Sequence, residues 1–178
     1  MDERKRNQIV IGIVLGAIGC GCLIWFAVMA AILYPVFVRG REKARQTICM
    51  DNQRQIALAV KQYAVDYHET LPPAFQWTES VKPYLHSDVI LSCPSARHLD
   101  CGYAFYQPLS GRKTKAISQP NFTPMLFDST KGQCNYADNG QSLAFRHLGG
   151  VIVAFVDRHI RWMKQNEAKS VFKYQSKP

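Results

Sequence analysis

The sequence contains few acidic residues and, over one long run, no charged residue at all. Asp and Glu number 13 against 22 Lys and Arg, so the formal net charge is +9. A basic surplus of this size suits nucleic acid, anionic lipid or an acidic protein partner. The basic residues are spread over the chain without interleaved aromatic residues, and no nucleic-acid-binding motif occurs. We therefore expect no nucleic-acid partner.

No Lys, Arg, Asp or Glu occurs between Ile9 and Val38. This run is longer than the roughly 20 residues that an α-helix needs to cross the hydrocarbon core of a bilayer. A cleaved signal peptide would have a shorter apolar stretch, followed by a small-residue cleavage site. The sequence therefore predicts a single-pass membrane protein in contact with membrane lipid, with a basic N-terminal leader at 1–8 and a transmembrane helix at 9–38.

Three residues of this run bear on how the helix packs. Gly12 and Gly16 form a Gly-x-x-x-Gly pair, a spacing that lets two transmembrane helices approach closely. The alternative is that they are two of the glycines that such spans commonly contain. Pro35 predicts a kink near the end of the run. Basic residues flank the run on both sides, so the positive-inside rule leaves the orientation open.

Residues 39–71 have the spacing of an amphipathic helix that continues the transmembrane one and ends before Pro72. Apolar side chains recur at helical intervals along one face: Cys49, Ile56, Val60, Tyr63 and Tyr67. Polar side chains, among them Gln53, are expected on the opposite face. A helix with one apolar face must cover another element, and the domain that follows is the candidate.

Residues 72–178 are expected to form a small domain with long loops and at least one antiparallel pair of strands, which makes the fold class α+β. The stretch "VIVAFVDRHIRWM" reads as a hairpin with a two-residue turn at Asp157–Arg158. In that register four side chains share one face and form a core against the amphipathic helix: Val153, Phe155, Ile160 and Trp162. The short segment "WTESVKPYL" predicts a helix.

His147, Asp157 and His159 raise the question of a catalytic or metal site. His147 lies a full strand before Asp157, about 20 Å away in an extended chain. No activated nucleophile, Gly-rich phosphate loop or oxyanion-stabilising device occurs at a suitable spacing. We therefore interpret these three residues as structural and expect no enzymatic activity.

Oxygen-bearing side chains at Asp128, Asp138 and Asn139 flank a polar loop and could hold calcium. Their spacing matches no calcium motif, so we expect solvated acids and no cofactor, with calcium as the alternative.

Four cysteines follow the apolar run: Cys49, Cys93, Cys101 and Cys134. They permit three pairings, and Cys93 with Cys101 would close a short loop. A disulfide would place this domain outside the cytoplasm, whereas reduced thiols are the alternative. His98 between Cys93 and Cys101 does not give a structural zinc spacing.

Two stretches together resemble a known family: "AAILYPVFVRGREKARQTICMDNQRQIALAVKQYAVDYHETLPP" and "RHLGGVIVAFVDRHIRWM". They are similar to the first and last blocks of bacterial prepilin-type proteins with a His, nine residues, Asp-Gly motif. His147 and Asp157 match this motif, and Arg158 stands where the family has Gly. The resemblance implies a long N-terminal helix on a small antiparallel sheet, and subunits that stack by their helices into pilus or pseudopilus fibres, as in type II secretion.

The sequence departs from the pilin pattern at the processing site. Counted back from Pro35, the cleavage Gly falls on Ile13 and the acidic residue that follows it on Ile18. The resemblance therefore implies a permanently anchored pilin-like structural or assembly protein of the inner (cytoplasmic) membrane, with an extracytoplasmic C-terminal domain. Its expected partners are itself or other pilin-like subunits. The alternative is a membrane-tethered binding module that never joins a fibre.

Overall fold

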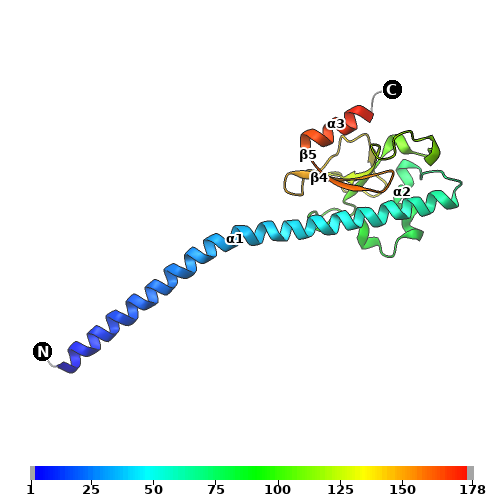
Figure 1. The fold of residues 1–178 in the computed structure, drawn as a ribbon. Coiled ribbons are helices and arrows are strands. Elements are labelled where there is room, and N and C mark those ends of the chain that lie inside the picture. The colour runs from blue at the N-terminus through cyan, green and yellow to red at the C-terminus, as the bar shows by residue number, and fades with distance from the viewer. Residues whose placement is uncertain (1–2, 176–178) are drawn as a thin grey trace. The chain divides into compact units, whose positions relative to one another are not determined.

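The computed structural model describes residues 3–175 of the chain (Figure 1). The chain divides into two compact units, Met1–Arg41 and Glu42–Pro178. We call the second unit the head domain. A single helix, α1 (Glu3–Asp66), runs from the first unit into the head domain.

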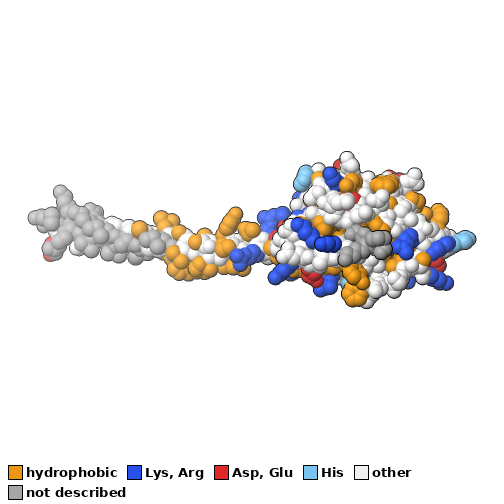
Figure 2. Space-filling model, turned by 90° about the horizontal axis from the view of Figure 1, so that it is seen from above, with side chains coloured by type: hydrophobic (Ala, Val, Ile, Leu, Met, Phe, Trp, Pro, Cys, Tyr) orange, Lys and Arg blue, Asp and Glu red, His pale blue; other side chains and the backbone are white. Residues whose placement is uncertain are grey.

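The first unit consists of α1 alone and presents apolar side chains to its surroundings (Figure 2). Leu23, Trp25 and Phe37 are all exposed. Among the described residues, α1 is the one helix long and apolar enough to cross a membrane. A Cβ at Gly12 or Gly16 would meet no other atom within 4 Å, so both positions are open for close approach of another helix. Pro35 lies inside the helix.

The head domain contains a five-stranded sheet in the order β3-β1-β2-β4-β5. The strands are β1 (Tyr103–Tyr106), β2 (Pro124–Asp128), β3 (Ala137–Asp138), β4 (Gly150–Phe155) and β5 (Ile160–Lys164). The predicted α+β class is confirmed. The sheet is mixed rather than wholly antiparallel, because β3 pairs in parallel with β1.

Two further α-helices complete the head domain. The first, α2 (Trp77–Val81), falls within the segment predicted to be helical. The second, α3 (Gln165–Gln175), follows β5 directly, and its Phe172 ring lies 5.1 Å from Phe127 and 5.6 Å from Tyr106. Single 3-10 turns lie at η1 (Ala74–Gln76), η2 (Lys82–Tyr84), η3 (Asp88–Leu91), η4 (Gln107–Leu109) and η5 (Thr114–Ala116).

The buried face of α1 differs from the predicted one. Cys49, Ile56 and Val60 are buried, as the periodicity indicates, but α1 ends at Asp66, earlier than predicted, and Tyr67 beyond its end is 54% exposed. Gln53, expected on the solvent face, is fully buried. The reason is its position, four residues after Cys49 and three before Ile56, which puts it on the same side of the helix as both. Its Nε2 donates hydrogen bonds to Asp128 Oδ1 and the Ile152 carbonyl, both at 3.1 Å, which offset part of the cost of burial, whereas its buried Oε1 has no partner among the described residues.

The β4–β5 hairpin is present, but its predicted register is wrong by one residue. The backbone N–H of Arg158 donates to the Phe155 carbonyl, and Phe155 N–H donates to the His159 carbonyl. Arg158 has a φ of 74°. This is a three-residue loop with its last residue in the left-handed region, not a two-residue turn.

The extra loop residue changes which side chains share a face of the sheet. Ile152 now pairs with Trp162, and Ala154 pairs with Ile160. Val153 pairs with Arg161 instead, and with Phe127 on β2, so it faces α3. The four predicted core side chains are therefore divided between the two faces of the sheet, because a one-residue slip moves every side chain to the other side. Val153 and Phe155 are buried, whereas Ile160 and Trp162 are partly buried against the core.

Candidate functional site

Three metal-ligating side chains from distant parts of the chain meet in the core of the head domain. Cys49 comes from α1, Cys93 follows η3, and His147 precedes β4. The Sγ atoms of Cys49 and Cys93 lie 2.7 Å apart, and Cys93 Sγ lies 3.5 Å from His147 Nε2. All three side chains are fully buried. We call Cys49, Cys93 and His147, with Asp128, the core cluster.

Local backbone features hold Cys93 in place. Gly102, just before β1, donates its backbone N–H to the Leu91 carbonyl at 2.8 Å. A Cβ at Gly102 would lie 2.6 Å from Cys93 Cβ, so only glycine allows this approach.

The loop that carries His147 is fixed from its own backbone and from β5. His147 and Gly150 exchange backbone hydrogen bonds at 3.1 and 3.0 Å across a tight turn. Trp162 donates its indole N–H to the His147 carbonyl at 2.7 Å. A Cβ at Gly150 would overlap the Trp162 ring, so the small residue lets the indole cover this turn. The imidazole is therefore placed by backbone contacts that do not involve the ring itself.

Two carboxylates face the two nitrogens of His147. Glu42 Oε1 lies 3.1 Å from Nδ1, and Asp128 Oδ2 lies 3.7 Å from Nε2. Asp128 is fully buried, and its carboxylate accepts hydrogen bonds from Gln53 and from the backbone N–H of Ile152 at 2.8 Å. Glu42 is the more exposed of the two acids, and its Oε2 lies 3.6 Å from Arg45 Nη1.

This arrangement shifts the pKa of each residue of the core cluster. The hydrogen bond between the two thiols, together with that from His147, lowers the pKa of Cys93, whereas the same thiol pair and burial raise the pKa of Cys49. Burial raises the pKa of Asp128 to about 7, against the pull of His147. Burial by itself would lower the pKa of His147, but the hydrogen bond to Cys93 and the charge of Asp128 outweigh it and raise this pKa. Cys93 is therefore the thiol that ionises more readily.

The order Cys93, His147, Glu42 is that of a nucleophile, a base and an orienting acid. A nucleophile also needs contact with its substrate, and Cys93 and His147 are both fully buried. What the cluster offers in this conformation is an enclosed set of sulfur, nitrogen and oxygen donors.

Of the three residues interpreted as structural, only His147 belongs to the core cluster. Asp157 and His159 lie in the β4–β5 loop, where Asp157 Oδ1 accepts from the His159 backbone N–H at 3.1 Å and lies 2.6 Å from His159 Nδ1. The His159 ring also stacks on Phe155, with the ring centroids 4.2 Å apart. These contacts shape the loop.

The disulfide candidate pair Cys93–Cys101 is wrong, because Cys101 is bonded to Cys134. The loop that carries Cys134 lies beside Cys101, whose backbone N–H donates to the Gly132 carbonyl at 3.2 Å. Cys93 is instead turned toward Cys49 in the core.

The suggested calcium ligands are not brought together by shared contacts. Asp138 accepts hydrogen bonds from the backbone N–H groups of Gly140, Gln141 and Ser142 and so closes its own loop. Asp128 points into the core cluster, and Asn139 is exposed.

Comparison with known proteins gives one finding. Residues 39–84 match the model of a family described as a protein of unknown function (DUF1559, SBP_bac_10). The matched stretch contains Cys49 and Gln53 but ends before Cys93, Asp128 and His147. No curated protein and no solved structure matches the chain.

Proposed function

We propose that the protein is a membrane-anchored, pilin-like structural or assembly protein, of the kind that serves type II secretion or type IV pilus-like systems. The observation that carries this proposal is α1: one uninterrupted helix from Glu3 to Asp66, apolar and exposed in the first unit and buried along one face in the head domain. A helix of this kind can hold a subunit in lipid and present a long surface to neighbouring subunits. The family match over 39–84 supports the same reading.

The proposed location is the inner membrane, with the head domain outside the cytoplasm. The disulfide between Cys101 and Cys134 supports this placement, because such bonds persist in oxidising compartments. Ile13 and Ile18 stand where pilins have the cleavage Gly and the acidic residue. We therefore propose that the N-terminus is not cleaved and that the basic leader stays attached to the span. Mass analysis of the N-terminus of membrane-extracted protein tests this point, and loss of the first 13 residues would contradict it.

Site-directed crosslinking tests the assembly itself. Cys20 and Cys22 are exposed on α1 and are first replaced by Ala, and single cysteines are then placed in turn along 9–38. Helix packing between subunits predicts crosslinked dimers that recur every three to four positions, since one face of the helix makes the contact. Solubilisation in detergent at low protein concentration serves as the control for random collision. Equal crosslinking at every position, or none at any, would exclude helix-mediated assembly.

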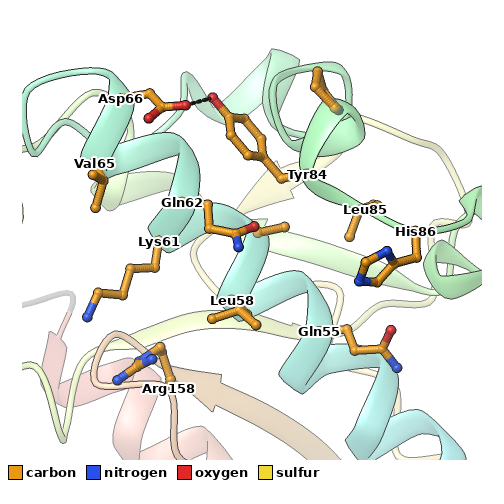
Figure 3. A pocket seen from close by; sticks show the side chains of 12 residues that line it. Gln55, Leu58, Lys61, Gln62, Val65, Asp66, Tyr84, Leu85, His86 and Arg158 are labelled. Carbon is orange, nitrogen blue, oxygen red and sulfur yellow. Dashed lines mark hydrogen bonds between the residues drawn. The ribbon is translucent and has the colours of Figure 1, made fainter.

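A groove in the head domain supports the alternative of a tethered binding module. It has a volume of about 670 Å³, and Leu58, Lys61 and Val65 of α1 line it together with Leu85 and His86 (Figure 3). Arg158 lies at one end, so that cationic and apolar side chains share one concave surface, and the volume is within the range of ligand pockets. A binding module would give no periodic crosslinks, and Lys61→Glu would reduce its retention on an anionic envelope polymer.

A further inference from the structure

We infer that the core cluster is a structural zinc site in which Cys49, Cys93, His147 and Asp128 are the four ligands. Such a site lies in the interior of the head domain, whether or not the protein assembles into fibres. The identity of the donor atoms, their separations and the groups that hold them all support it.

The donor set is that of a zinc site rather than a calcium or magnesium site. Two thiolates, an imidazole and a carboxylate suit a tetrahedral, borderline-soft cation, whereas calcium and magnesium take oxygen ligands almost alone. Cys49, Cys93, Asp128 and His147 are all shielded from solvent, with exposures of 0%. Buried groups that ionise are costly unless a charge or a metal compensates them, and a divalent cation would compensate both thiolates.

Two of the measured separations match the edges of a zinc tetrahedron. With Zn–S near 2.3 Å and Zn–N and Zn–O near 2.0–2.1 Å, a sulfur–nitrogen edge is about 3.6 Å and a nitrogen–oxygen edge about 3.4 Å. Cys93 Sγ and His147 Nε2 lie 3.5 Å apart, and His147 Nε2 and Asp128 Oδ2 lie 3.7 Å apart. The sulfur and nitrogen ligand atoms of Cys49, Cys93 and His147 all fall within 4.8 Å of one another.

The separation of the two sulfurs is shorter than such an edge, because Cys49 Sγ and Cys93 Sγ lie 2.7 Å apart. A sulfur–sulfur edge around zinc is about 3.8 Å, so the two atoms must separate by about 1 Å. Each Sγ sits on a single rotatable bond, and a modest rotation of the two side chains supplies this separation without moving α1.

Groups behind the ligands are placed as in known zinc sites, where a second partner orients each histidine and carboxylate. With its proton on Nδ1, His147 donates a hydrogen bond to Glu42 Oε1, 3.1 Å away, and the Nε2 lone pair is then free to coordinate. Gln53 and the Ile152 backbone N–H hold the Asp128 carboxylate. Glu42 and Gln53 are both residues of α1, so the same helix that supplies Cys49 also orients the other ligands.

The consequence is that the metal would fasten α1 to the sheet. Cys49 and the two orienting residues lie on the helix, whereas Cys93, Asp128 and His147 come from a loop, β2 and a second loop. Since such a site rarely exists in an unfolded chain, the free energy of metal binding becomes folding free energy.

The competing fate of the two thiols is a disulfide between Cys49 and Cys93. Their oxidation would release two protons and two electrons, which a disulfide-bonded thiol oxidoreductase of the envelope could accept. A disulfide would account for the two cysteines but would give no role to the convergence of His147 and Asp128 on them. We therefore favour the metal and use the disulfide as the decisive opposing outcome.

The test uses the full-length protein, extracted in detergent, with an affinity tag that contains no histidine. Elemental analysis gives its zinc content, and intact mass without reductant counts the disulfides. We expect one zinc ion per chain and one disulfide, Cys101–Cys134. Removal of zinc with a chelator and addition of Co²⁺ alone should give the visible d–d bands and thiolate charge-transfer absorption of a tetrahedral thiolate site.

Variants assign the ligands and keep the test independent of folding failure. Asp128→Asn and His147→Gln should each lower the Zn²⁺ affinity by at least tenfold, and Glu42→Gln, which changes only an orienting group, by about 10–100-fold. His159→Gln, outside the cluster, is the matched control and should bind normally. Wild-type protein that carries a second disulfide, or that takes up neither Zn²⁺ nor Co²⁺ with its thiols free, would overturn the proposal whatever the variants do.

Discussion

Gln53 on α1 donates a hydrogen bond to Asp128 on β2, with 3.1 Å between Nε2 and Oδ1, and both side chains are fully buried. This contact joins the C-terminal part of the long helix to the central strand of the sheet through polar atoms. Gln53 Nε2 also donates a hydrogen bond to the Ile152 carbonyl on β4, so one amide group connects the helix to two adjacent strands.

Replacement of Gln53 by Leu is expected to destabilise the head domain by about 1–3 kcal/mol, because Asp128 Oδ1 and the Ile152 carbonyl would lose a buried donor. Thermal unfolding of the full chain in detergent measures the change. Gln55→Leu is the matched control, since Gln55 is exposed on the same helix and should have little effect. Equal melting temperatures for the two variants would contradict the role assigned to Gln53.

The disulfide between Cys101 and Cys134 closes a loop with a sequence separation of 33 residues. Loop-closure entropy for a ring of this size is worth about 4 kcal/mol. We therefore expect Cys101→Ser with Cys134→Ser to lower the free energy of unfolding by a similar amount. The bond is absent from the double variant, so added reductant should lower the stability of the wild type toward that of the variant. A reductant effect of equal size on both would place the critical disulfide elsewhere.

Some of this structure could be predicted because the signal was local. The charge-free run from Ile9 to Val38 and the helical periodicity after it need only neighbouring residues to be recognised, and both belong to α1. The β-branched apolar run at 151–156 and the polar pair after it predict the residues of the β4–β5 hairpin, but such a pattern does not count loop residues. The third loop residue therefore changed the register.

The core cluster could not be predicted because its members are distant in sequence. Cys49 and Cys93 are 44 residues apart, and Cys93 and His147 are 54 apart. Metal motifs are recognised from short, fixed spacings, and none occurs here. The polar type of Gln53 predicts a solvent-facing side chain, whereas its helical position between Cys49 and Ile56 indicates burial. A polar residue between two apolar residues of the same face was the available signal for a buried network.

The β4–β5 loop offers a test of backbone strain. Arg158 has a φ of 74°, a conformation that costs a non-Gly residue roughly 1 kcal/mol. Arg158→Gly is therefore expected to raise the free energy of unfolding by about 0.5–1 kcal/mol, after allowance for the greater freedom of glycine in the unfolded chain. Arg158→Ala is the control, since alanine keeps the Cβ and should give no gain. If the two variants had equal melting temperatures, the loss of the arginine side chain rather than the relief of backbone strain would explain the result.

The stability of the metal-free protein is expected to depend on pH through the buried carboxyl of Asp128. Burial raises the pKa of Asp128 from 3.8 to about 7 in the folded chain, with His147 acting against this rise and Cys93 adding to it. Between about pH 4 and pH 7 the folded state therefore binds more protons at this site than the unfolded state. The contribution of Asp128 to the free energy of unfolding then falls as the pH rises through this window, by up to about 4 kcal/mol.

Comparison of the wild type with Asp128→Asn isolates this contribution, because the amide does not titrate. In the presence of a chelator, we expect the stability of the variant relative to the wild type to increase from pH 4 to pH 7 and to level off outside that range. Added salt should leave the difference nearly unchanged, because a buried carboxyl is poorly screened. Parallel pH profiles for the two proteins would mean that the carboxyl of Asp128 is in contact with water. The core cluster would then not be enclosed, and the zinc assignment depends on an enclosed set of donor atoms.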